Sequence, residues 1–175
     1  MTDVPAEFPP PPYSAPIKVS TAARRFILIA SGALFTLGTI GSNIGPAWVD
    51  ERPAVVLAMA SRSRNLFGSV PFIDPLPYAL IGFTRIFIAG LVLFFLGRWY
   101  GERAIAWTEQ KTGELPALYR WFAKAIDKAG WLVIILFCGS NLVWMMAGHR
   151  RIDPRKFASL LAIGIAIRLA VLWAG

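Results

Sequence analysis

Three long apolar stretches constrain most strongly what this chain can fold into. They lie at about 26–47, 76–97 and 157–174, and each is close to the roughly 20 residues that a helix needs to cross a bilayer. The chain is 56% hydrophobic and only 16% charged, which is typical of an integral membrane protein. We therefore predict an all-α, polytopic membrane protein in which residues 21–175 form a single membrane domain.

Residues 1–20 precede this domain and include the proline-rich run PAEFPPPPYSAP. Proline lacks an amide hydrogen and disfavours helical backbone in the residue before it. We therefore predict that residues 1–20 form a disordered tail, and we expect it in the cytoplasm.

Two further apolar segments, at about 53–70 and 130–148, are interrupted by polar residues. Arg62, Arg64 and Asn65 interrupt the first, and CGSN, which ends at Asn141, interrupts the second. The apolar part of the first segment is too short to cross a bilayer. We predict that both segments are re-entrant hairpins, whose unpaired backbone groups must face protein or water.

The formal charge of +8 could indicate a nucleic-acid partner in a soluble protein, but here basic residues flank apolar segments, and anionic lipid explains them without nucleic acid. The positive-inside rule predicts a multi-pass protein of the cell membrane with a cytoplasmic N-terminus. A hairpin at 130–148, in place of a crossing, keeps the basic run HRRIDPRK on the cytoplasmic side.

The segment at about 101–128 alternates apolar residues with Arg120, Lys124 and Lys128 at helical spacing. This pattern predicts an amphipathic helix that lies in the membrane interface, with a break near 113–116.

An offset of 79 residues places the IDP at Ile73–Pro75 over the IDP at Ile152–Pro154. Each half then contains an apolar hairpin, a polar connection with Asp-Pro, and a full span. Together with the charge distribution, the match predicts an inverted repeat, an arrangement found in transporters. Asp74 and Asp153 also fit helix N-caps, because Asp before Pro is a favoured helix start.

Arginine inside an apolar span needs a partner, because burying its charge costs about 2.5–3.5 kcal/mol on insertion scales. Arg168 is close enough to the end of its span to snorkel, whereas Arg85 needs a carboxylate, helix-end carbonyls, water or an anionic ligand. Guanidinium binds phosphate through two parallel hydrogen bonds. We predict that lipid headgroups bind the following residues: Arg62, Arg64, Arg85 and Asn141.

A structural ion pair is the competing explanation for Arg85. Its candidate partners are Asp50, Glu51 and Asp74, all near the outer ends of spans, and any of them could instead take part in proton coupling. With a single histidine and a single cysteine, the sequence offers no metal cluster and no nucleophile–base pair, so we expect neither an enzyme nor a bound cofactor.

Short motifs resemble the DedA (SNARE-associated, VTT-domain) membrane proteins. LGRWYG, Leu96–Gly101, is similar to the Gly-Arg-x-x-Gly that follows a span in that family, and 128–164 is similar to its second hairpin and basic connection. The resemblance runs from about Pro53 to the end. Phe137 is kept, but the arginines and the proline of that hairpin are missing, and Asn141 stands in place of the last arginine.

The resemblance implies two opposed re-entrant hairpins and the movement of lipid between leaflets, with polyprenyl phosphate or phospholipid as substrate. We therefore expect a flippase or scramblase of anionic lipid. The alternative is a non-transporting accessory subunit of a larger membrane complex, with a second copy or another membrane protein as its partner.

Overall fold

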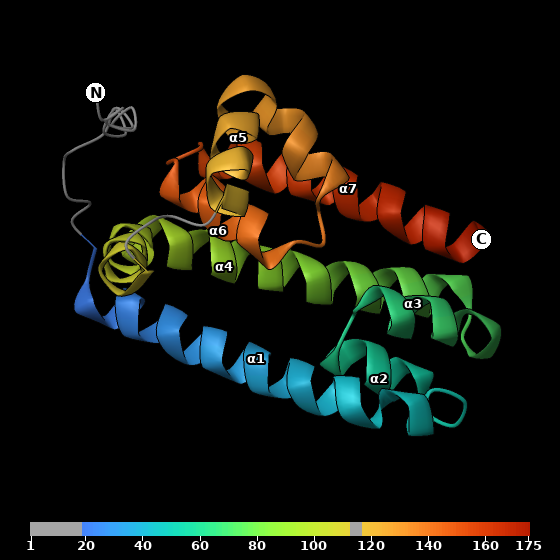
Figure 1. Cartoon of the computed structure of the whole chain (residues 1–175). Coiled ribbons are helices and arrows are strands. Elements are labelled where there is room, and N and C mark those ends of the chain that lie inside the picture. Colours follow the sequence, from blue (N-terminus) through green and yellow to red (C-terminus); the bar gives the residue numbers. More distant parts are fainter. Residues whose placement is uncertain (1–18, 113–116) are drawn as a thin grey trace, which may run out of the picture.

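The computed structural model describes residues 19–112 and 117–175, and most of the predicted tail at 1–20 lies outside them. All secondary structure in the described residues is helical (Figure 1). In chain order the elements are α1 (Thr21–Trp48), α2 (Pro53–Met59), α3 (Ser63–Ser69), the 3-10 turn η1 (Val70–Phe72), α4 (Pro75–Thr112), α5 (Ala117–Leu136), α6 (Asn141–His149) and α7 (Pro154–Ala174).

Within the described residues, three helices are long and apolar enough to cross a membrane: α1, the Pro75–Gly101 part of α4, and α7. The prediction of an all-helical chain with three potential spans is thus confirmed. Figure 1 shows that α1 and α7 run in one direction and α4 runs in the other, so α1 and α7 begin at the same end of the molecule.

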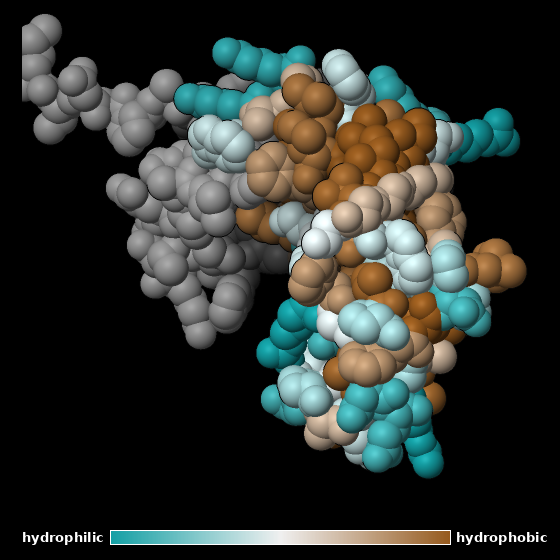
Figure 2. Space-filling model, turned by 90° about the vertical axis from the view of Figure 1, so that its right-hand side faces the viewer, coloured by the Kyte–Doolittle hydropathy of each residue, from teal (hydrophilic) through white to brown (hydrophobic). Residues whose placement is uncertain are grey.

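Large apolar side chains are exposed along these helices, among them Phe26, Ile29 and Phe35 on α1 and Val171 on α7. Seen from the end at which α7 finishes, hydrophobic atoms gather in the middle of the upper half of the molecule, and hydrophilic atoms lie at its upper edges (Figure 2). Hydrophilic atoms gather over the lower half, at the height of the α1–α2 connection in Figure 1. An apolar exterior of this kind suits contact with lipid tails.

The first helical hairpin, α2–α3, packs closely on α1. An added Cβ at Gly41 would lie 2.6 Å from the Met59 Cβ, so only glycine permits this approach. The buried Asn65 side chain closes the turn, since its Nδ2 donates to the Ala60 carbonyl at 2.8 Å and to the Gly41 carbonyl at 3.5 Å.

Replacing Asn65 by alanine should therefore lower the free energy of unfolding by about 1–3 kcal/mol, because buried carbonyls lose their donor. Thermal unfolding in mild detergent checks this. The matched control is Asn43→Ala, since Asn43 is exposed and donates only to Thr39 in its own helix. Equal unfolding midpoints for the two variants would contradict a stabilising role for Asn65.

The second helical hairpin is formed by the last part of α5 and by α6. Helix α5 kinks at Ala129, where φ is −146° and ψ is 49°, and it ends at Leu136. Helix α6 packs on α4, where Gly97 faces the Met145 backbone and Gly148 faces the Phe94 backbone. The core between α4 and α7 includes Phe94 and Phe157, whose rings stack with centroids 4.3 Å apart.

The predicted interfacial helix at 101–128 is not a separate element. Its first part continues α4 to Thr112, and its last part begins α5 at Ala117. Helix α4 runs through LGRWYG, and Gly97 and Gly101 leave room there for Met145 and His149 of α6. The predicted break at 113–116 lies outside the described residues.

Asp153 has the N-cap role predicted for it. Its Oδ1 accepts hydrogen bonds from the backbone N–H of Arg155 at 2.9 Å and of Lys156 at 3.0 Å, and Pro154 occupies the first position of α7.

Candidate functional site

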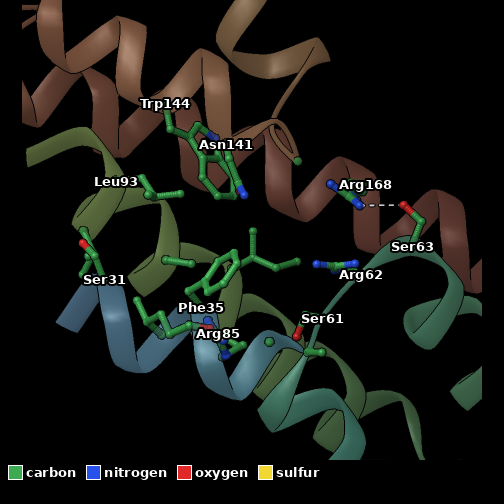
Figure 3. A pocket seen from close by; sticks show the side chains of 17 residues that line it. Ser31, Phe35, Ser61, Arg62, Ser63, Arg85, Leu93, Asn141, Trp144 and Arg168 are labelled. Carbon is green, nitrogen blue, oxygen red and sulfur yellow. Dashed lines mark hydrogen bonds between the residues drawn. The ribbon is translucent and has the colours of Figure 1, made fainter. Parts of the chain in front are cut away.

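A cavity of about 450 Å³ lies among α1, α4, α7 and the turns of both helical hairpins (Figure 3). Its lining includes three of the four residues predicted to bind a headgroup, namely Arg62, Arg85 and Asn141, and it also includes Arg168. The remaining lining is apolar or weakly polar and contains no carboxylate from the described residues.

Arg85 finds its partners at the end of α2. Its Nε donates to the Ala58 carbonyl at 2.9 Å, and its Nη2 donates to the carbonyls of Met59 at 3.0 Å and of Leu34 at 3.2 Å. Ala58 and Met59 are the last residues of α2, whose carbonyls have no partner within the helix. A positive charge also suits the negative end of a helix dipole. Arg85 therefore ties the first hairpin to α1 and α4.

Arg62 occupies the N-cap position of α3 and is exposed. Its side chain makes no hydrogen bond or ion pair to any side chain or backbone group that the structure describes. In Figure 3 it lies on the same side of the cavity as Arg168. Its donors are therefore available to a bound anion.

Asn141 begins α6 and is exposed on the opposite wall of the cavity, next to Trp144 (Figure 3). Its amide has no hydrogen-bond partner within the described part of the chain, and it can donate to an oxygen-rich ligand. Arg64 is different, because it does not line the cavity and its Nη2 donates to the Ser42 carbonyl of α1. The prediction that Arg64 shares the headgroup site is not supported by this position.

The three candidate acids all lie away from the cavity. Asp50 and Glu51 are exposed in the α1–α2 connection, where Asp50 Oδ1 accepts from the Glu51 N–H at 3.0 Å. Asp74 precedes α4, and its carbonyl accepts from the Tyr78 N–H at 3.1 Å. None of the three forms a salt bridge with a described side chain, and Arg85 donates to backbone carbonyls in place of the carboxylate that the alternative required.

Arg168 was the residue whose importance the sequence left open. Its Nη2 donates to Ser63 Oγ at 2.7 Å, so it reaches into the molecule and meets the start of α3 (Figure 3). The signal that could have identified it is the same as for Arg85, a guanidinium within an apolar span. In the described residues no group of three His, Cys, Asp or Glu side chains could hold a metal ion.

Three apolar helices around a cavity lined by arginines indicate an α-helical membrane protein with a cationic interior site. No family model matches the chain, and no curated protein or solved structure is significantly similar to it. The resemblance to the DedA family therefore remains a hypothesis that depends on the short motifs.

Proposed function

We propose that this protein is a DedA-like transporter that moves an anionic lipid, such as polyprenyl phosphate or a phospholipid, between the leaflets of the cell membrane. The observation that carries the proposal is the cavity itself, which is lined by three guanidinium groups and, among the described residues, by no carboxylate. Uncompensated cations are costly inside a membrane, and an anionic headgroup would neutralise them.

In this proposal both helical hairpins are re-entrant. Helices α2 and α3 have seven residues each and α6 has nine, so they are about 10–14 Å long at 1.5 Å per residue, against about 30 Å of hydrocarbon. Such short helices would enter the bilayer and turn back. Arg85 and Asn65 supply donors to backbone carbonyls near the first turn, as a turn within hydrocarbon requires.

The proposed inverted repeat follows from the same offset of 79 residues. That offset relates Pro75, at the start of α4, to Pro154, at the start of α7, and it relates the turn at 60–62 to the turn at 139–141. Both turns contribute to the cavity lining. Because α4 and α7 run in opposite directions (Figure 1), the two halves would be inverted relative to each other.

We place the N-terminus in the cytoplasm because basic residues gather at the end where α1 and α7 begin, including Arg24, Arg25, Arg155 and Lys156. Cysteine labelling tests this orientation in a Cys138→Ala background. Lys156→Cys should react only when the reagent reaches the cytoplasmic side, and Asp74→Cys only from the other side. The reverse pattern, or reaction of both from one side, would contradict the orientation.

Reconstitution tests transport itself. Liposomes that contain the protein should exchange labelled phosphatidylglycerol or polyprenyl phosphate between leaflets, and Arg62→Gln should slow the exchange at least about tenfold because a phosphate hydrogen bond to guanidinium is lost. Arg25→Gln, at the exposed start of α1, is the control. Exchange no faster than in empty liposomes, with folded protein verified, would reject transport.

The alternative, a non-transporting accessory subunit, is favoured by one feature of α1. Gly32 is exposed and an added Cβ would meet nothing within 4 Å, so a helix of another membrane protein or of a second copy could approach closely there. Purification of the native complex in mild detergent separates the two functions. A stoichiometric partner, together with an isolated chain that does not transport, would favour the subunit.

A further inference from the structure

Arg168 contacts the turns of both helical hairpins from its position on α7. Its Nη2 donates to Oγ of Ser63, the first residue of α3, at 2.7 Å. Its guanidinium also covers Gly139 in the other turn, where an added Cβ would overlap Nη1. One cationic side chain thus joins the first hairpin, the second hairpin and α7 at the cavity (Figure 3).

The contact with Ser63 is chemically weak for a guanidinium in this setting. A serine hydroxyl is neutral and offers a single oxygen, and no described carboxylate lies within salt-bridge distance of Arg168. Phosphate carries negative charge and offers two oxygens in the geometry of the guanidinium fork, so it can accept two parallel hydrogen bonds from Arg168 where Ser63 accepts one. A phosphate group in the cavity should therefore displace Ser63.

We infer that Arg168 is a ligand of the phosphate group, and that its hydrogen bond to Ser63 is a resting contact which the phosphate group breaks. This inference rests on the proposed function. Arg62, which has no partner among the described residues, supplies the second guanidinium, whereas Arg85 remains on the carbonyls of α2. Because the Ser63 contact joins α3 to α7, headgroup binding also removes one of the contacts between the first hairpin and α7, while the apolar packing of Leu66 and Leu169 remains.

Substitution of Ser63 provides the most direct test. If Ser63 competes with the phosphate group for Arg168, removing its hydroxyl should strengthen lipid binding. The purified full chain in detergent micelles is titrated with phosphatidic acid, with phosphatidylcholine as the reference lipid. Ser63→Ala should bind phosphatidic acid more tightly, by up to about tenfold, because Arg168 no longer has to leave the Ser63 hydroxyl. Arg168→Gln should bind it at least about tenfold more weakly, and Arg168→Lys should be intermediate because an ammonium lacks the planar fork.

The matched control is Ser159→Ala, on the same helix as Arg168. Ser159 is exposed and donates to the Arg155 carbonyl of its own helix, so its removal should leave the affinity unchanged. Excess inorganic phosphate should compete with phosphatidic acid, because both present the same group. Binding of inorganic phosphate alone would mean that the cavity takes a free ion, and it would overturn the assignment to a lipid headgroup.

The failures of the two ideas can be told apart. If the unsubstituted protein binds no phosphatidic acid, the proposed function itself fails. If it binds, but Ser63→Ala leaves the affinity unchanged or lowers it, Arg168 is a structural tie and the inference is overturned while the proposed function stands. Unfolding midpoints of all variants verify that the proteins are folded. If Arg168→Gln does not fold, the affinity of Ser63→Ala decides whether Arg168 is a phosphate ligand or a structural contact.

Discussion

Replacing Gly148 by leucine is expected to prevent folding, and replacing it by alanine should already destabilise the protein by about 3 kcal/mol or more, in the upper range for overpacked cores. An added Cβ at Gly148 would overlap the Phe94 carbonyl oxygen and would lie 2.9 Å from the Arg98 backbone nitrogen. Both are backbone atoms of α4, so no side-chain rotation can make room. Helices α4 and α6 would have to separate along their most extensive contact.

Gly97 provides an independent check of the same contact from the other helix, because its added Cβ would overlap the Met145 carbonyl of α6. The control is Gly32→Leu on α1, where an added Cβ meets nothing within 4 Å and the position is exposed. Size-exclusion chromatography and thermal unfolding in mild detergent measure the effect. A Gly148→Ala protein with the unfolding midpoint of the unsubstituted chain would show that α6 does not pack on α4 in this way.

Replacing Arg85 by leucine is expected to cost about 3 kcal/mol or more of stability, since hydrogen bonds to a charged group contribute about 1.5–3 kcal/mol each. The substitution leaves the carbonyls of Leu34, Ala58 and Met59 without the guanidinium that now binds them. The stability of Arg85→Lys should lie between that of Arg85→Leu and that of the unsubstituted protein, because one ammonium cannot reproduce the geometry of the guanidinium fork. Thermal unfolding midpoints provide the measurement.

Arg62→Leu is the variant to compare with Arg85→Leu, in both stability and lipid binding. Arg62 lines the same cavity but is exposed and has no partner in the described residues, so its loss should spare stability and weaken the binding of phosphatidic acid. The opposite result, a stable Arg85→Leu protein that no longer binds lipid, would return Arg85 to the role of headgroup ligand and contradict its role as a structural tie between α4 and α2.

The sequence predicted those features that depend on one continuous segment of the chain. Apolar length identified the three spans, and Asp-Pro identified the start of α7. For Arg85 the sequence established that a partner was needed and named helix-end carbonyls as one option. It could not select them over a carboxylate, because that choice depends on α2 ending beside α4 in space.

Contacts between distant segments were not predictable in this way. LGRWYG indicated only a resemblance to a motif that follows a span, and the close packing of its two glycines on α6 was not predicted. Likewise, Arg64 and Arg62 are two residues apart in sequence, yet only Arg62 lines the cavity. At the start of α3, the Arg62 side chain lines the cavity, whereas the Arg64 side chain donates to the Ser42 carbonyl of α1.

The measurement that tests the central claim most directly is the depth and water accessibility of the two turns in a bilayer. Spin labels at Ser61→Cys and Asn141→Cys, in a Cys138→Ala background, line the cavity from the two hairpins. Ile167→Cys on α7 serves as the lipid-facing reference, because Ile167 is 52% exposed. Power saturation with oxygen and with a water-soluble nickel chelate reports separately the depth of each label in the bilayer and its accessibility to water.

If the two turns meet inside the membrane around a hydrated cationic cavity, both turn labels should lie near the centre of the bilayer and still be relaxed by the nickel chelate, whereas the Ile167 label should respond to oxygen alone. Turn labels at headgroup depth, or labels near the centre that the nickel chelate cannot reach, would contradict a hydrated cavity between two re-entrant hairpins.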